Sequence, residues 1–115
     1  MKYINKKLTI ENVKVQNIAK KFGTPAYCYS YNQLKKNINN FKRSFKSFSP
    51  LICFAIKSNT NVNLISEIRK LGLGADVVSM GELMKALKAG IKPNKIVFSG
   101  VGKTVEEIKY AINKK

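Results

Sequence analysis

Three segments of this chain repeat the same order of strand and helix at nearly constant spacing. The apolar runs that predict strands start near residues 51, 74 and 96, so successive strands begin 23 and 22 residues apart. A segment with helical periodicity of its apolar residues follows each run. A βα period this short predicts parallel strands joined by helical crossovers, which places the chain in the α/β class.

The predicted helices begin at residues that can cap them. A hydroxyl residue followed three positions later by glutamate is the capping box, in which each side chain bonds a backbone N–H at the start of the helix. This spacing occurs at Ser79–Glu82 and at Thr104–Glu107, and Ser30–Gln33 predicts the start of a further helix. The helical start signals therefore agree with the strand spacing.

The first 29 residues are less regular. They predict a short strand near 8–10, a helix near 15–21 and a strand at 26–29. Three parallel strands leave exposed sheet edges, and a complete βα barrel requires roughly 200 residues or more. We therefore expect the chain to be the front part of a longer barrel protein and to be unstable when expressed alone.

Lys57 closes the first predicted strand. The apolar residues Leu51–Ile56 lead directly into it, a pattern typical of a strand at about 51–57 that is buried on both faces. The carboxyl end of parallel strands is where α/β enzymes place their chemistry. A lysine near apolar neighbours can act as an amine nucleophile toward a carbonyl group. The alternative is a lysine that stands at a strand end by chance, because lysine is very common in this chain.

Asp76 lies within the second predicted strand, and aspartate is unusual in a short apolar strand. A buried carboxylate needs a partner, and Lys57 on the neighbouring strand could be that partner. The alternative is an aspartate at the entrance of a strand, solvated or bonded to a turn, and both interpretations stay open. Ser99 ends the third predicted strand and could face the same end of a barrel.

The formal net charge of +16 would ordinarily indicate an anionic partner. Only Arg43 and Arg69 are arginines, and the lysines are spread along the whole chain. The abundance of lysine, asparagine and isoleucine indicates a codon bias toward A and T. Nucleic-acid-binding proteins rely more on arginine and concentrate it on one face. We therefore expect no nucleic-acid partner, with a small basic nucleic-acid-binding module as the alternative from a different class.

Other classes of site find little support in the composition. The chain has no histidine and six scattered acidic residues, so we expect no metal site. Cys28 and Cys53 are interpreted as small core residues. The apolar runs are far shorter than the ~20 residues that span a bilayer, and the N-terminus lacks an apolar signal region. We therefore predict a cytoplasmic protein without a membrane partner.

One short motif invites comparison with a nucleotide site. Gly100–Thr104 contains the sequence GVGKT, but a phosphate loop needs a glycine where this chain has Val97. We interpret the glycines as a tight turn and Thr104 as the cap of the next helix.

Four segments, in order, resemble diaminopimelate decarboxylases. They are FGTPAYCYS at 22–30, CFAIKSN at 53–59, GLGADVVSMGEL at 72–83 and KIVFSGVGKT at 95–104. The resemblance covers about residues 22–112. Relatives of this family, which include ornithine/arginine-type decarboxylases and the more remote alanine racemases, are similar in the barrel and in the cofactor lysine.

The resemblance implies a fold and a reaction. The family combines a pyridoxal-phosphate-binding (β/α)8 TIM barrel of fold-type III with a C-terminal β-sandwich. By this resemblance, residues 30–115 are the first three βα units of the barrel, and residues 1–29 join the absent sandwich. The complete enzyme is expected to be a homodimeric lyase that decarboxylates meso-diaminopimelate to L-lysine in lysine biosynthesis.

The resemblance also implies roles for two residues. Lys57 matches the catalytic lysine that binds pyridoxal 5'-phosphate covalently, and Asp76 matches an acidic residue near that lysine. The phosphate-binding and substrate-binding segments of the family lie beyond residue 115, so we expect this chain alone to be inactive. An ornithine/arginine-type substrate is the alternative within the same fold.

Overall fold

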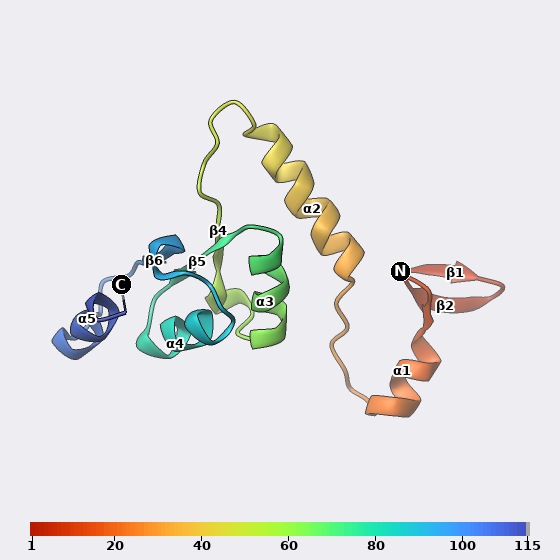
Figure 1. Ribbon diagram of the computed structural model, residues 1–115. Coiled ribbons are helices and arrows are strands. Elements are labelled where there is room, and N and C mark those ends of the chain that lie inside the picture. Colours follow the sequence, from red (N-terminus) through yellow and green to blue (C-terminus); the bar gives the residue numbers. More distant parts are fainter. Residues whose placement is uncertain (115) are drawn as a thin grey trace. The chain divides into compact units, whose positions relative to one another are not determined.

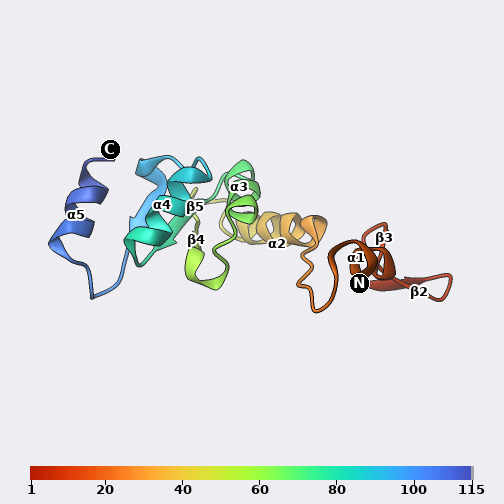
Figure 2. The ribbon, with the colours of Figure 1, turned by 90° about the horizontal axis from the view of Figure 1, so that it is seen from below.

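The computed structural model describes residues 1–114, and the chain divides into two compact units between Lys46 and Ser47 (Figure 1). The first unit contains a three-stranded antiparallel sheet and two helices. Its elements are β1 (Lys2–Ile4), β2 (Lys7–Ile10), β3 (Val13–Lys14), α1 (Val15–Phe22) and α2 (Tyr31–Ser44). Helix α1 packs against β2 and β3 (Figure 2). The strand predicted near 8–10 and the helix predicted near 15–21 are confirmed.

The hairpin of β1 and β2 was not predicted. It closes through Asn5 and Lys6, which have φ angles of 48° and 61°, and a two-residue hairpin turn of type I′ requires positive values at both positions. The strand predicted at 26–29 is wrong. These residues are irregular and pair with no strand in the described part of the chain, and Tyr27 is 94% exposed.

Glu11 connects the turn after β2 to the start of α2. Its carboxylate accepts hydrogen bonds from the Ser30 hydroxyl at 2.6 Å and from the Asn32 backbone N–H at 2.8 Å. These two bonds lower the pKa of Glu11. Ser30 in turn accepts from the backbone N–H of Gln33 at 3.1 Å, so the predicted cap of this helix is confirmed.

The second unit contains a three-stranded parallel sheet in the order β4-β5-β6. Its parallel βα arrangement is the α/β class that the strand spacing predicted. The elements are β4 (Cys53–Ala55), the 3-10 turn η1 (Ile56–Ser58), α3 (Val62–Lys70), β5 (Gly74–Val77), α4 (Met80–Lys88), η2 (Pro93–Lys95), β6 (Ile96–Phe98) and α5 (Val105–Ile112). No helix among residues 1–114 is long and apolar enough to cross a membrane.

The first strand of this unit differs from its prediction. We expected a strand at about 51–57 buried on both faces, but β4 covers only Cys53–Ala55 and its three residues are half-buried. Leu51 lies outside the strand and is 50% exposed. The reason is that β4 pairs only with β5 among the described residues. It is therefore an edge strand, and the central strand β5 is the more buried one.

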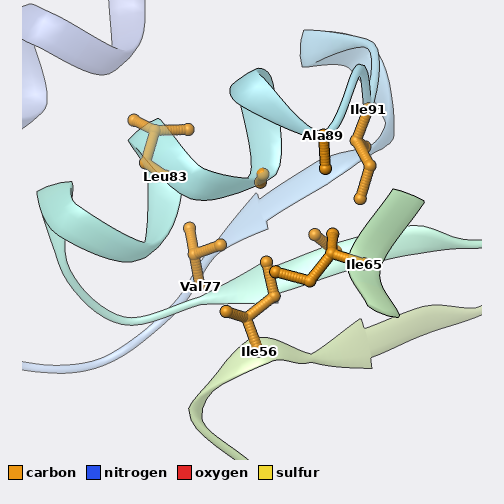
Figure 3. Close-up of a cluster of buried hydrophobic side chains, with 8 residues drawn as sticks. Ile56, Ile65, Val77, Leu83, Ala89 and Ile91 are labelled. Carbon is orange, nitrogen blue, oxygen red and sulfur yellow. The ribbon is translucent and has the colours of Figure 1, made fainter. Parts of the chain in front are cut away.

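The core lies between the parallel sheet and helices α3 and α4. Figure 3 shows Val77 of β5 facing Leu83 of α4, and Ile56 beside Ile65 of α3. Ile56, Ile65 and Val77 are fully buried. Since alternate residues of a strand point to opposite faces, Ala75 and Val77 face the helices, and Gly74 and Asp76 face the other side of the sheet.

The two predicted capping boxes have different outcomes. At Thr104 the box is complete, because the Thr104 hydroxyl accepts from the N–H of Glu107 and the Glu107 carboxylate accepts from the N–H of Thr104. Ser79 also caps its helix, since its hydroxyl accepts from the N–H of Glu82 at 3.3 Å. The Glu82 carboxylate, however, accepts from the N–H of Val78 at 2.9 Å, so the second half of that box moves one residue earlier.

Candidate functional site

The sheet of the second unit has one face that α3 and α4 do not cover. In its register Cys53 lies opposite Gly74, Ala55 opposite Asp76, and Asp76 opposite Val97. Register partners on neighbouring strands point to the same face. These residues, together with Ser99 just after β6, form what we call the open face of the sheet. Asp76 is its acidic member.

Lys57 lies at the carboxyl end of β4, in the 3-10 turn η1. The turn is fixed by the Ser58 hydroxyl, which donates to the Ala55 carbonyl at 2.8 Å, and by the Asn59 N–H, which donates to the Ile56 carbonyl at 2.9 Å. Ile56 is fully buried, whereas Lys57 is exposed. The local sequence therefore anchors the turn in the core and presents the Lys57 amine to the surroundings.

Asp76 is bound to Ser99. The Asp76 Oδ1 atom accepts a hydrogen bond of 2.5 Å from the Ser99 hydroxyl. Among residues 1–114 there is no ion pair between Asp76 and Lys57, so the direct partnership suggested by the sequence is not formed. Ser99 is in reach because its backbone N–H extends the sheet ladder by donating to the Val77 carbonyl at 2.9 Å.

The repeat in the sequence contains the signal that could have identified this pair. Ser99 follows Asp76 by 23 residues, which is about one βα repeat, and equivalent positions of neighbouring parallel strands lie close together. Sequence reasoning noted each residue separately and did not connect them.

The prediction that Cys28 and Cys53 are small core residues is wrong. Cys53 lies on the open face and is half-buried, because β4 is an edge strand, and Cys28 is exposed, because residues 26–29 form no strand. Burial, followed by the nearby negative charge of Asp76, raises the pKa of the Cys53 thiol.

The loop after β6 is a turn followed by a cap, as predicted. Gly100 has a φ angle of 92°, which glycine adopts easily, and Thr104 caps α5. Glu107 also accepts a hydrogen bond from the backbone N–H of Met80 at 3.0 Å. Bonds from Thr104 and then Met80 lower the pKa of Glu107, and they join the starts of α4 and α5.

One cavity of about 190 Å³ is lined in part by Arg69, Gly90 and Lys95, and another of about 680 Å³ in part by Pro93 and Ile112. Both lie near the amino end of β6, and neither is lined by Lys57 or the open face. The candidate site is the carboxyl end of the sheet, where the exposed Lys57 follows the register partner of Asp76 by two residues.

Residues 31–115 match the protein family described as pyridoxal-dependent decarboxylase, pyridoxal binding domain. A diaminopimelate decarboxylase of Helicobacter pylori strain J99 is 50% identical over 91 residues, which are 79% of this chain and 22% of that protein.

The chain is also similar to solved structures. A crystal structure from Aquifex aeolicus has a TM-score of 0.91 at 43% identity and covers 98% of this chain and 28% of that one. The diaminopimelate decarboxylase of M. jannaschii in co-complex with L-lysine has a TM-score of 0.91 at 37% identity, over 96% of this chain and 27% of that one. This chain therefore spans about a quarter of the length of the relatives that it matches.

Proposed function

Because the chain belongs to the family of pyridoxal-dependent decarboxylases, whose pyridoxal-binding domain it matches from residue 31, we propose that it is the N-terminal part of a diaminopimelate decarboxylase. The complete protein then converts meso-diaminopimelate to L-lysine and carbon dioxide with pyridoxal 5'-phosphate as cofactor. The observation that carries the proposal is the exposed amine of Lys57 at the carboxyl end of a parallel strand. The similarity to proteins named for this activity gives the substrate.

The residues of the site fit the aldehyde end of such a cofactor. A covalent attachment needs a primary amine that is accessible, and Lys57 is exposed and forms no ion pair within residues 1–114. Asp76 supplies a carboxylate on the open face near that end of the sheet. When bound, pyridoxal phosphate supplies the electron sink for the breaking bond. In this proposal Lys57 holds the cofactor, and Asp76 provides negative charge beside a cationic nitrogen.

The proposal includes a domain organisation. Residues 1–29 join a C-terminal β-sandwich, and residues 30–115 begin a (β/α)8 barrel that the rest of the protein completes. Substrate and phosphate are then held by groups outside this chain, so the 115 residues alone bind the cofactor weakly and do not turn over. We also propose a homodimer in the cytoplasm. Light scattering of the purified complete protein and cell fractionation test these two points.

The sequence is compatible with two other functions. An ornithine/arginine-type decarboxylase shares the fold, and a comparison of carbon dioxide release from meso-diaminopimelate and from L-ornithine separates the two substrates. A basic nucleic-acid-binding module would use the +16 charge. Site-selective binding with a steep but saturable dependence on salt would support it, whereas non-selective binding that vanishes at moderate salt would mean charge alone. The family membership favours the decarboxylase over that module.

The decisive experiment is chemical trapping. The complete protein is incubated with pyridoxal phosphate, reduced with borohydride, digested and mapped by mass spectrometry. We expect the label on Lys57 and none on Lys103, which follows another strand of the same sheet and serves as an internal control. A Lys57→Ala variant should take up no specific label. A label that maps to another lysine, or that persists in this variant, would refute the assignment.

A further inference from the structure

The two oxygens of the Asp76 carboxylate have different surroundings. Oδ1 accepts the 2.5 Å hydrogen bond from the Ser99 hydroxyl. Oδ2 has no hydrogen-bond partner within residues 1–114. Every fully buried side-chain nitrogen or oxygen atom of these residues does have a partner, so Oδ2 is not one of the buried atoms. Oδ2 is therefore accessible on the open face. One oxygen holds the carboxylate in place and the other is available to a donor.

Ser99 is a well-fixed donor. Its backbone N–H donates to the Val77 carbonyl at 2.9 Å, which ties it to the central strand. The residue after it, Gly100, lies close to Val78, since a Cβ built there would meet the Val78 side chain at 3.6 Å. The backbone around Ser99 is therefore held against the carboxyl end of β5, and the Ser99 hydroxyl is limited to the few staggered rotamers of its side chain.

Lys57 and Asp76 belong to neighbouring strands at the same, carboxyl end of the sheet. Ala55 is the register partner of Asp76, and Lys57 follows Ala55 by two residues, in the turn that leaves the strand. Its flexible four-carbon side chain therefore starts from the end of the sheet at which Asp76 lies. A carboxylate attracts a nearby ammonium most effectively when it is preorganised, because no reorientation is then required.

We propose that Ser99 is a positioning residue of this site. Its hydroxyl fixes the Asp76 carboxylate through Oδ1, so that Oδ2 is presented to a cationic nitrogen at the Lys57 end of the open face. Ser99 does not contact the reacting atoms itself and acts only through Asp76. This inference rests on the proposed function, because Lys57 must be the amine that holds the cofactor.

A double-mutant cycle on the complete protein tests the inference. The variants are Ser99→Ala, Asp76→Asn and the combination, and the readout is the initial rate of borohydride-trapped pyridoxal phosphate label on Lys57. We expect Ser99→Ala to slow labelling about tenfold, as loss of an orienting partner commonly does. If Ser99 acts through Asp76, Ser99→Ala adds nothing in the Asp76→Asn background, because coupled residues are not additive.

Three further variants make the result specific. Ser99→Thr keeps the hydroxyl and should restore most of the labelling rate. Ser99→Cys keeps a side chain of similar size but replaces the hydroxyl by a weak thiol donor. It should slow the labelling of Lys57, and it tests the inference independently should the alanine variant not fold. Ser66→Ala removes a half-buried hydroxyl of α3 that is not the hydrogen-bond donor to Asp76, and this variant should be labelled at the same rate as the unsubstituted protein.

The outcomes separate the two claims. Absence of label on Lys57 in the unsubstituted protein would overturn the proposed function. Normal labelling there, together with an unchanged rate in Ser99→Ala and Ser99→Cys, would overturn only the role of Ser99. A further contrary result is that Ser99→Ala slows labelling by the same factor in the Asp76→Asn background as in the unsubstituted protein. That result, or a Ser99→Thr variant as slow as Ser99→Ala, would show that Ser99 does not act through the carboxylate.

Discussion

Replacement of Gly74 by alanine should separate two strands of the parallel sheet. Gly74 begins β5, and a Cβ built there would lie 2.2 Å from the backbone carbonyl oxygen of Lys95 and 3.0 Å from the Cys53 sulfur. Ordinary contact begins at 3.4 Å, so the backbone before β6 would have to move by about 1 Å. Overpacking of this kind costs about 3 kcal/mol at the upper end of its usual range, because a carbonyl oxygen of the backbone cannot rotate away.

Amide hydrogen exchange of the complete protein measures this cost locally. A loss of about 3 kcal/mol corresponds to roughly hundredfold faster exchange in peptides that cover β5 and β6, with the hairpin of β1 and β2 unchanged. Gly81→Ala is the matched control, since the nearest atom to its Cβ is the Ser79 hydroxyl at 4.0 Å. It lies in α4 and should be neutral or stabilising by up to about 1 kcal/mol. Exchange in Gly74→Ala within twofold of the unsubstituted protein would show that the close approach is not rigid.

The remaining predictions concern packing, pH and thiol chemistry. Ile65→Val removes one methylene from a fully buried site and should cost about 1 kcal/mol, seen as faster amide exchange in α3; no change would mean that the core is loosely packed. The hydrogen bond from the Thr104 N–H is the main cause that lowers the pKa of Glu107. The ionised Glu107 therefore contributes to stability at pH values above the ordinary pKa of 4.5, and this contribution is lost as the pH falls through the lowered pKa. Glu107→Gln should therefore flatten the acid side of the stability profile, and an unaltered profile would contradict this. Asp76→Asn removes one of the two causes that raise the pKa of the Cys53 thiol, so alkylation of this thiol near pH 8 should become faster; an equal rate in both proteins would argue against the electrostatic coupling.

The local features of the second unit could be read from the sequence. Ser79 and Thr104 mark the starts of α4 and α5, and the apolar periodicity identifies the helical faces. These signals lie within a few residues of the element that they predict, so no distant partner is needed to interpret them. The parallel order of the strands followed from the short βα spacing in the same way.

Features that depend on distant partners could not be predicted so well. Residues 26–29 have the composition of a strand but find no strand to pair with in the described part of the chain. The apolar residues before Lys57 suggested burial on both faces, yet β4 is an edge strand. In both cases composition gave the right propensity, and the missing neighbour decided the outcome, because a strand is stabilised only through its partners.

The sequence by itself determined the α/β class, the position of Lys57 after the first parallel strand and the resemblance to a decarboxylase family, which the family match and the related proteins confirm. Only the tertiary structure decided that the Asp76 carboxylate is held by Ser99 and that burial, followed by the charge of Asp76, raises the pKa of the Cys53 thiol. The physical reason is the register of the sheet. Hydrogen bonds between strands bring side chains from different βα repeats within bonding distance, and that register is set by the packing of the whole unit.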